Sequence, residues 1–367
     1  MSKTAAVAIS GGIDSLYAAH LLLKSGYNVQ GVHFVTGYEP DTLTDQTHPY
    51  KTSNKVIHHC KCSDAVTASM SIVAEQLGIE IHIIDCHDTF QNKVVDYFIN
   101  SYQTGKTPSP CLACNPTVKF GALLDFTDKI GAEFLATGHY AQIEIDQNGI
   151  HHLHKGVDNK KDQSYFLAFL NQTQLKKAKF PLGDKTKVEI IENAKAANLK
   201  PVSSEESQDV CFIKDNDYKE FLLSCPDFSI SPGVIKTSDG KEIGKHSGLH
   251  SFTVGQRRGI DCPGPAPYYV LKLDVETNSL IVGFKDELLA KSCKVSGISW
   301  INKPESKKVT VRTHIRYRHN GAESQLELTE NNTGVIIFNE PVSAITPGQG
   351  AVFYSGSEVL GGGWIES

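Results

Sequence analysis

The first 200 residues alternate between strand patterns and helix patterns, and this alternation constrains the fold more than any other feature of the chain. Short apolar runs such as TAAVAIS and EIHIID have strand character, and each precedes a segment whose apolar residues have helical spacing. This order is typical of an open, mostly parallel α/β sheet with helices on its faces. Ligands of such sheets bind at the carboxyl ends of the strands.

Several local signals set the expected boundaries within this part. We expect a helix from Ser15 to Lys24 with Gly26 behind it, a helix that Ser63 caps, and a helix that Gly105 closes. The run EFLATGHYAQIEI is predicted to be one strand. Residues 39–55 are polar and turn-rich, and we expect a loop there.

The pattern changes after about residue 210. Helical spacing fades, and glycines and prolines separate short β-like runs such as YYVLKLDVETNSLIVG and GQGAVFYSGSEVLGGGWI. The sequence therefore predicts an α/β domain over residues 1–210, a small central β domain over 211–287 and a C-terminal β-barrel over 288–367. The expected split between the β domains falls near residues 285–292.

Composition narrows the class of protein. The chain has 367 residues, a net charge of −5 and 40% hydrophobic residues, as in an ordinary globular protein. The charge argues against a nucleic-acid binder held by global charge, but it leaves room for a local basic face. We expect a cytoplasmic protein without membrane association, because we find neither a secretory signal nor an apolar run of ~18 residues. Nine cysteines in such a chain favour reduced, catalytic or metal-bound thiols.

The turn SGGIDS, residues 10–15, lies between the first strand pattern and the first helix pattern. Backbone N–H groups at a helix N-terminus bind phosphate, and glycines let the ligand approach the main chain closely. The turn is not a Walker A loop, since no Lys-Ser/Thr pair closes it. Asp14 suits a Mg²⁺ role beside phosphate oxygens. The alternative is a purely structural glycine turn.

Three cysteines stand in informative places. Cys111 and Cys114 form a Cys-x-x-Cys motif ahead of a helix pattern. The pKa of a thiol near a helix N-terminus is lowered, which makes the thiol a better nucleophile. Cys211 follows an acidic polar run about a hundred residues downstream. A disulfide between distant cysteines requires their Cα atoms to come within roughly 7 Å. We therefore expect a mobile segment around Cys211.

The turn SGGIDS resembles the PP-loop of ATP pyrophosphatases, which cleave ATP between the α and β phosphates. Together with CNPTVKF, ATGHYA, KGVDNKKDQSYFLAFL, FPLGDKTKVEI, SQDVCFI, SFTVGQRRGI, RYRH and TPGQGAVFY, it makes nearly the whole chain similar to the tRNA-specific 2-thiouridylase family. The resemblance implies adenylation of O2 of the wobble uridine, followed by its replacement with sulfur. It implies a persulfide on Cys211 and a nucleophilic or resolving role for Cys114.

The resemblance also implies binding residues. ATP and Mg²⁺ are implied at Ala8, Ser10, Gly11, Gly12, Asp14, Ser15, Phe34 and Gly138. Contacts with tRNA are implied for Ser109, Pro110, Cys111, His139, Lys161, Asp162, Gln163, Arg316, Tyr317 and Gln349. The anticodon loop suits such an enzyme, because unstacked bases can be turned into a pocket. A sulfur-donor protein and a monomer on its tRNA are implied as well.

Other interpretations of the cysteines and histidines stay open. Cys111, Cys114 and Cys211 could hold a 4Fe-4S cluster with one open iron, or zinc, or serve structure only. The stretch VIHHCKCSDA crowds His58, His59, Cys60 and Cys62 and could bind a metal or form an ordinary loop. We expect Cys86, Cys225, Cys262 and Cys293 to be small buried apolar side chains.

A basic stretch supplies the local positive charge that binding to RNA requires. Residues 303–319 hold six Lys or Arg against one Glu, and we expect them to alternate along a strand with Tyr317 between Arg316 and Arg318. One face could then follow phosphates while the aromatic ring stacks on a base. The alternative is a charged outer face of a β-barrel.

The sequence therefore predicts an ATP-dependent tRNA 2-thiolation enzyme. One rival is another PP-loop adenylating enzyme, an amidotransferase or synthetase with a small-molecule substrate. A second rival is a non-catalytic RNA-binding or sulfur-carrier relative. The sequence leaves open which tRNAs are modified, which protein donates sulfur, whether a cluster takes part, and the oligomeric state.

Overall fold

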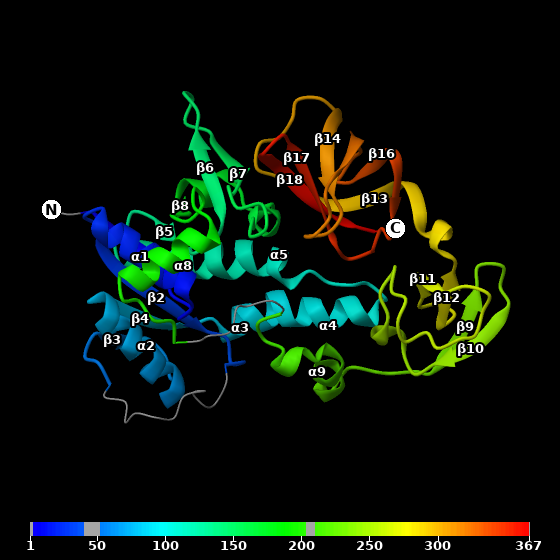
Figure 1. The fold of residues 1–367 in the computed structure, drawn as a ribbon, viewed down its shortest axis with the longest axis horizontal. Coiled ribbons are helices and arrows are strands. Elements are labelled where there is room, and N and C mark those ends of the chain that lie inside the picture. The colour runs from blue at the N-terminus through cyan, green and yellow to red at the C-terminus, as the bar shows by residue number, and fades with distance from the viewer. Residues whose placement is uncertain (1–2, 40–51, 203–209, 367) are drawn as a thin grey trace. The chain divides into compact units, whose positions relative to one another are not determined.

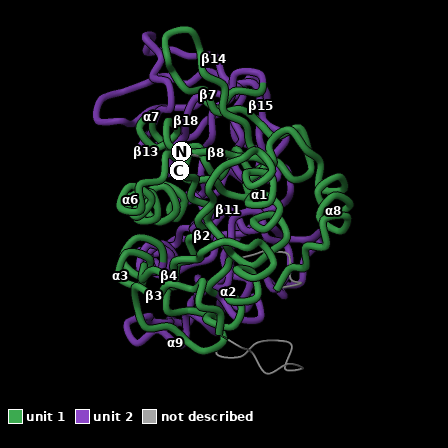
Figure 2. The backbone as a smooth tube through the Cα atoms, turned by 90° about the vertical axis from the view of Figure 1, so that its left-hand side faces the viewer, with its two compact units in different colours: residues 1–94, 113–212, 357–359 green, residues 95–112, 213–356, 360–367 purple. Residues whose placement is uncertain are grey.

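The computed structural model describes residues 3–39, 52–202 and 210–366 (Figure 1). The chain divides into two compact units, which Figure 2 colours separately. Unit 1 comprises residues 1–94, 113–212 and 357–359, and unit 2 comprises residues 95–112, 213–356 and 360–367.

Unit 1 is built on a parallel sheet in the order β3-β4-β2-β1-β5-β8. Its strands are β1 (Thr4–Ala8), β2 (Asn28–Val35), β3 (Val56–His58), β4 (Glu80–Asp85), β5 (Leu135–Ala136) and β8 (Ala178–Lys179). Its helices include α1 (Ile13–Lys24), α2 (Asp64–Leu77), α3 (His87–Phe90), the π-helical segment η2 (Asn115–Ala122), α6 (Leu123–Lys129), the 3₁₀ turn η3 (Ser164–Leu167), α7 (Gln172–Lys176) and α8 (Lys187–Ala196). The predicted parallel α/β class is confirmed.

Apolar periodicity explains why these elements pack. Ala5 and Val7 of β1 are buried in the same core as Leu16 and Ala19 of α1. Alternate residues of the strand therefore pack against one face of the helix. The Ser63 hydroxyl accepts a hydrogen bond from Val66 N at the start of α2, which confirms the predicted cap.

The run EFLATGHYAQIEI is not one strand, as predicted, but two. β5 pairs with β1 in the parallel sheet, whereas β6 (Ala141–Ile145) forms a hairpin with β7 (His151–Lys155). The break lies at residues 137–140, where Gly138 packs directly against the start of α1: a Cβ at Gly138 would lie 2.9 Å from the Asp14 carbonyl carbon. This close approach turns the chain out of the sheet.

Unit 2 contains a four-stranded sheet in the order β10-β9-β12-β11 and a closed barrel. The small sheet comprises β9 (Gly233–Thr237), β10 (Glu242–His246), β11 (Tyr269–Asp274) and β12 (Ser279–Gly283). The barrel comprises β13 (Leu289–Trp300), β14 (Lys308–His314), β15 (Ala322–Leu328), β16 (Gly334–Ser343), β17 (Gly350–Ser355) and β18 (Glu358–Ile365), and pairing of β13 with β18 closes it. Two small β structures, the last a barrel, are therefore confirmed.

Short helical elements complete the chain. They are the π-helical η1 (Gln91–Val95), α4 (Asp96–Gln103), α5 (Pro110–Cys114), η4 (Lys214–Asn216), α9 (Tyr218–Ser224), η5 (Leu249–Ser251) and η6 (Lys285–Leu288). As predicted, Gly105 follows α4, with a left-handed φ of +69°.

The basic stretch departs from its predicted form. β14 ends at His314, so Arg316, Tyr317 and Arg318 lie in the turn before β15 rather than on the strand. The burial of Thr313, His314 and Ile315 in succession ends the alternation of inward and outward residues. The predicted arrangement of Tyr317 between arginines on a strand is therefore wrong.

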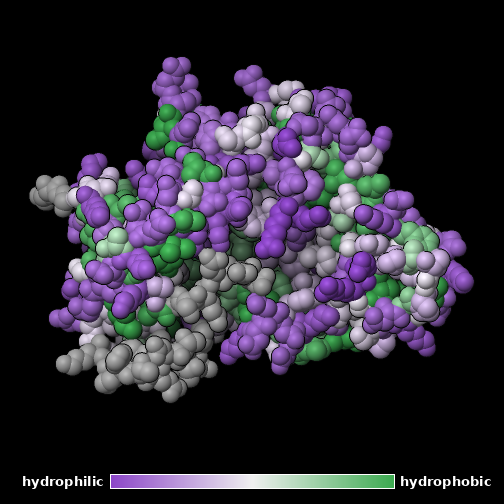
Figure 3. All heavy atoms as spheres, viewed as in Figure 1, coloured by the Kyte–Doolittle hydropathy of each residue, from purple (hydrophilic) through white to green (hydrophobic). Residues whose placement is uncertain are grey.

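The helices of the described ranges are all too short or too polar to cross a lipid bilayer. Figure 3 shows hydrophilic residues over most of the face in view. Most of the predicted loop over residues 39–55 lies outside the described residues.

Candidate adenylation and sulfur-transfer site

The turn from Ser10 to Ser15 connects the carboxyl end of β1 to α1, and its serines hold it in shape. Ser15 Oγ donates to Gly12 O at 2.9 Å, and the two serine Oγ atoms are 3.3 Å apart. Gly11 has a left-handed φ of +84°, which favours glycine. The first amides of a helix lack intrahelical acceptors, so this turn suits a phosphate ligand.

Asp14, in the first turn of α1, is held by a cation and a hydroxyl group. Lys187 Nζ lies 2.8 Å from Oδ1 and 2.9 Å from Oδ2 of Asp14. The Tyr140 hydroxyl donates to Oδ1 at 2.8 Å. The Lys187 side chain is only 11% exposed, so this ammonium group is fixed beside the phosphate turn.

The position of Lys187 is locally unfavourable and is stabilised by its partners. Lys187 is the first residue of α8, where the helix dipole disfavours a cation. Its backbone N donates to Asp158 Oδ2 at 3.0 Å, and this hydrogen bond is the main cause of the lowered pKa of the Asp158 carboxyl. Asp158 Oδ1 also accepts from Lys160 N, so this carboxylate links the start of α8 to the turn at residues 158–163.

That turn contains the predicted tRNA contacts Lys161, Asp162 and Gln163. Asp162 Oδ1 accepts from Gly156 N at 3.0 Å, and burial raises the pKa of its carboxyl against the effect of such hydrogen bonds. Gln163 Oε1 accepts from Tyr140 N at 3.1 Å. The side chains of Asp162 and Gln163 therefore hold the turn, and their contact with tRNA stays a prediction.

The predicted adenine pocket lies beside the phosphate turn, at residues of β1, β2 and the segment after β5. Ala8 and Phe34 are half-buried, and Gly138 abuts Asp14. His33 Nδ1 donates to Ile9 O at 2.8 Å, which leaves Nε2 as the acceptor of this ring. That Nε2 atom is buried and has no hydrogen-bond partner among the described residues, so a polar ligand atom would satisfy it.

The predicted sulfur-handling thiols Cys114 and Cys211 both belong to unit 1. Cys114 ends α5 and is 8% exposed, whereas Cys111, three residues before it, is exposed. Cys211 is also exposed, but desolvation by the surrounding atoms raises the pKa of its thiol. The neighbouring Phe212 is buried and its ring contacts Tyr38 and Phe90, which anchors Cys211 on one side.

Lys119 connects Cys211 electrostatically with His139. Its ammonium charge opposes the rise in the pKa of the Cys211 thiol, and it adds to the effect of burial that holds the pKa of His139 well below its usual range. His139 is therefore a neutral imidazole near pH 7, and its Nδ1 lies 2.7 Å from Thr137 Oγ1. Lys119 is therefore a positive charge that acts on both Cys211 and His139.

In unit 2, the segment before α5 is clamped to the turn between β16 and β17. Gln349 Nε2 donates to Thr107 O and Pro108 O, each at 3.0 Å. The Tyr97 hydroxyl accepts from Ser109 N at 3.2 Å. The predicted tRNA contact Gln349 thus positions the segment that carries Ser109, Pro110 and Cys111.

The charges of β14 are neutralised within the barrel. Lys308 Nζ lies 2.6 Å from Glu327 Oε1, and Arg312 Nη1 lies 3.1 Å from Glu323 Oε1. Arg316 and Arg318 are exposed and make no ion pair with any described residue, whereas Tyr317 is half-buried. The contact of Arg316 and Tyr317 with tRNA stays a prediction.

The stretch around His58 does not gather its side chains at one point. His59 Nε2 lies 3.0 Å from His82 Nδ1, whereas Cys62 Sγ lies 3.5 Å from His58 Nδ1. Cys60 contacts Ile83 O. Among residues 3–39, 52–202 and 210–366, no three His, Cys, Asp or Glu side chains are grouped as metal ligands. The described residues therefore offer no ready ligand set for a metal at this stretch.

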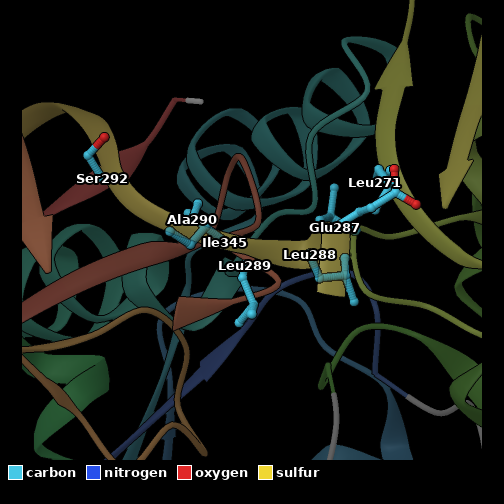
Figure 4. A pocket seen from close by; sticks show the side chains of 8 residues that line it. Leu271, Glu287, Leu288, Leu289, Ala290, Ser292 and Ile345 are labelled. Atoms are coloured by element: carbon cyan, nitrogen blue, oxygen red, sulfur yellow. The ribbon is translucent and has the colours of Figure 1, made fainter. Parts of the chain in front are cut away.

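Four more cysteines and a pocket lie outside the candidate site. Cys86 and Cys293 are buried, as expected, whereas Cys225 and Cys262 are only half-buried. A pocket in unit 2 is lined mainly by apolar side chains, among them Leu288, Ala290 and Ile345 (Figure 4). Its carboxylate, Glu287, accepts a hydrogen bond from Phe284 N, so the pocket lacks groups for phosphate chemistry.

Sequence interpretation missed Lys119, Tyr140 and Lys187 as site residues. All three stand inside motifs that carried the family resemblance. The signal for Lys187 was a lysine directly after the helix cap Thr186, where an acidic residue is the usual choice. Lys119 gave no such signal, because its role depends on long-range folding.

The chain is similar to known proteins over nearly its whole length. Family models match residues 3–215 as "tRNA methyl transferase HUP domain", residues 219–284 as "tRNA methyl transferase PRC-barrel domain" and residues 290–365 as "Aminomethyltransferase beta-barrel domain". A protein of Desulfosudis oleivorans named tRNA-specific 2-thiouridylase MnmA is 43% identical over 99% of this chain and 94% of its own length. Proteins of the same name from Geobacter metallireducens and Desulfotalea psychrophila are 39% and 42% identical, over 100% and 98% of this chain and 97% and 98% of their own lengths.

Proposed function

We propose, from the premise that this chain belongs to the tRNA-specific 2-thiouridylase family, that it replaces O2 of the wobble uridine of tRNA with sulfur while converting ATP to AMP and pyrophosphate. One observation carries this proposal. A glycine turn that suits phosphate and two cysteines, Cys114 and Cys211, belong to the same compact unit. The turn suits activation of the oxygen, and the thiols suit delivery of sulfur.

Adenylation turns a poor leaving group into a good one. The uridine O2 attacks the α phosphorus of ATP, the bond to the β phosphate breaks, and pyrophosphate leaves. The amides around Gly11 and Gly12 hold the phosphates, and Lys187 adds a fixed positive charge beside them. The adenine is assigned to Ala8, Phe34 and Gly138, with Ser10 and Ser15 shaping the turn.

Mg²⁺ is assigned to Asp14 together with phosphate oxygens. A divalent cation offsets phosphate charge, and carboxylate is a suitable ligand. Both Asp14 oxygens lie within 2.9 Å of Lys187 Nζ, so the ion fits only where phosphates supply most of its ligands. Asp14→Ala is expected to abolish adenylate formation and thiolation together, and normal AMP release by this variant would remove Asp14 from the reaction.

Sulfur transfer is assigned to Cys211 and Cys114. A donor protein leaves a persulfide on Cys211, and the Cys114 thiolate then attacks its inner sulfur. This step forms a Cys114–Cys211 disulfide and releases hydrosulfide, which attacks C2 and expels AMP. A thiol reductant must reduce the disulfide before the next turnover, so electrons and sulfur balance.

Contacts with tRNA are assigned in each unit separately. In unit 2 they are assigned to Ser109, Pro110, Cys111, Arg316, Tyr317 and Gln349, and in unit 1 to His139, Lys161, Asp162 and Gln163. We further propose a cytoplasmic monomer that works with a sulfur-donor protein. The division into residues 1–210, 211–287 and 288–367 assigns adenylation to the first part and tRNA binding to the last.

The iron-sulfur alternative remains distinguishable by experiment. Enzyme purified without oxygen is incubated with unmodified tRNA and ATP, with either a persulfide donor or sulfide, and its iron is counted. Thiolation from the persulfide donor by iron-free protein is the expected result. Thiolation that increases with iron content and uses sulfide as the sulfur source would instead assign Cys111, Cys114 and Cys211 as ligands of a 4Fe-4S cluster.

Replacement of the persulfide cysteine separates the two half-reactions. Cys211→Ser is expected to abolish 2-thiouridine formation while tRNA-dependent AMP release continues, because adenylation needs no thiol. Cys225→Ser, at a half-buried cysteine of unit 2, is the matched control and keeps both activities. Retained thiolation by Cys211→Ser would exclude the persulfide role, and AMP release without tRNA would favour a small-molecule synthetase.

A further inference from the structure

We propose that residues 253–259, here called the arginine turn, bind phosphates of the tRNA backbone through Arg257 and Arg258. This inference rests on the proposed function, because it names a further contact surface for the same RNA substrate. Four features carry it: the rigidity of the turn, its unneutralised charge, its attachment to the segment at Thr107, and the chemistry of adjacent guanidinium groups.

The backbone of the arginine turn is fixed by Gln256. Gln256 Oε1 accepts from Thr253 N at 3.1 Å, and Gln256 Nε2 donates to Arg258 O at 2.8 Å. The main chain pairs with β11, since Val270 N donates to Gln256 O at 2.9 Å. Gly255 and Gly259 have left-handed φ values of +88° and +79°, so glycine is suited to both bends. The two arginines therefore extend from an ordered platform.

The charges of Arg257 and Arg258 are not neutralised within the protein. Both side chains are exposed, and neither makes an ion pair with a described residue. Asp261, the nearest acidic residue in sequence, pairs with neither of them. The barrel residue Arg312, by contrast, lies 3.1 Å from Glu323. Two adjacent unpaired cations in a chain of net charge −5 mark a local anion-binding surface.

The arginine turn is attached to the segment that leads into α5. Thr253 Oγ1 lies 3.2 Å from Thr107 Oγ1, and both residues belong to unit 2. Gln349 binds the carbonyl of the same Thr107. Arg257 is four residues from Thr253, a reach of at most about 14 Å. The turn that carries the arginines is thus attached to the segment assigned to the target base.

Guanidinium chemistry favours RNA phosphate as the partner. Each guanidinium presents a planar set of donors that matches two phosphate oxygens. Such contacts position a nucleic acid without reading its sequence. An acidic surface of the sulfur-donor protein would need the same charges, and the experiment separates it from RNA.

The test compares Arg257→Gln/Arg258→Gln with Lys241→Gln/Lys245→Gln. The control removes two exposed cations at β10, the edge of the small sheet opposite β11. The Kd for unmodified tRNA transcript is measured from low to high salt. The arginine variant is expected to bind about tenfold more weakly, with a log–log salt slope reduced by about two, while its Kd for ATP stays unchanged. Arg257→Lys/Arg258→Lys should recover most of the slope.

Other outcomes overturn the inference. A Kd and salt slope equal to those of the lysine control would exclude phosphate binding by the arginine turn. Normal tRNA binding with lost sulfur acceptance from the donor protein would assign the turn to that protein instead. The wild-type enzyme is assayed for thiolation in parallel, so failure of the proposed function is recognised separately from failure of this inference.

Discussion

At the scale of single residues, one lysine influences the protonation of two predicted site residues. Lys119 lies near Cys211 and His139, and it favours the thiolate of the first while disfavouring the protonated form of the second. Desolvation still outweighs this effect at Cys211, whose thiol has a raised pKa. Cys211 is therefore protonated near pH 7 before it receives sulfur, which protects it from unwanted oxidation.

The effect of Lys119 can be measured by alkylation. The rate of Cys211 modification by iodoacetamide should rise with pH through a midpoint above the ordinary thiol value, because only the thiolate reacts. Lys119→Gln is expected to move this midpoint to still higher pH, since it removes a charge that stabilises the thiolate. Lys129→Gln, at an exposed lysine of α6, should leave the midpoint unchanged. A midpoint that falls in Lys119→Gln would contradict the assigned electrostatics.

At the scale of elements, hydrogen bonds rather than regular pairing hold the binding segments. The clamp of Gln349 on Thr107 and Pro108 joins a turn of the barrel to the segment before α5. Gly348 contributes by its size, because a Cβ there would lie 2.8 Å from Thr107 O. The position of Ser109 and Cys111 thus depends on residues more than 200 positions downstream.

Removal of this clamp should impair tRNA use selectively. Gln349→Ala leaves two carbonyl groups without their donor, at a cost of roughly 1–3 kcal/mol. We expect kcat/KM for tRNA to fall about tenfold or more, with KM for ATP unchanged. Gln325→Ala, at an exposed position of β15, is the control in the same barrel. Equal losses in both variants would assign Gln349 to barrel stability rather than to positioning.

The sequence patterns predicted some features of these elements and missed others. The parallel α/β class and the cap at Ser63 follow from periodicity and local backbone chemistry, so they could be predicted. The division of EFLATGHYAQIEI could not, because it depends on Gly138 meeting Asp14, which is distant in sequence. The pairing of Asp14 with Lys187 and the end of β14 before Arg316 likewise depend on tertiary contacts.

At the scale of the whole molecule, we propose that this acidic chain binds tRNA through a few cations that have no described carboxylate partner. The net charge of −5 and the ion pairs of Lys308 and Arg312 leave little general attraction for phosphate. Binding should therefore depend on exposed arginines in turns, because no described carboxylate offsets the positive charge of these side chains. Affinity that depends on a few phosphate contacts falls in a graded way with salt.

Single substitutions in the barrel test this distribution of charge. Arg316→Gln is expected to weaken tRNA binding several-fold and to reduce the log–log salt slope by about one. Arg312→Gln should change the slope much less, because Glu323 already neutralises that guanidinium. The comparison requires Kd values for one tRNA over a series of salt concentrations. A larger effect of Arg312→Gln would show that the strand, rather than the turn, contacts RNA.

In the proposed reaction, the uridine oxygen itself is adenylated before sulfur replaces it. The most direct test is a single turnover on tRNA that carries a heavy oxygen isotope at O2 of the target uridine, with mass analysis of the AMP released. We expect AMP with one heavy oxygen atom for each 2-thiouridine formed, because the leaving oxygen stays on phosphorus. Unlabelled AMP accompanying thiouridine, or thiouridine formed without AMP, would contradict it.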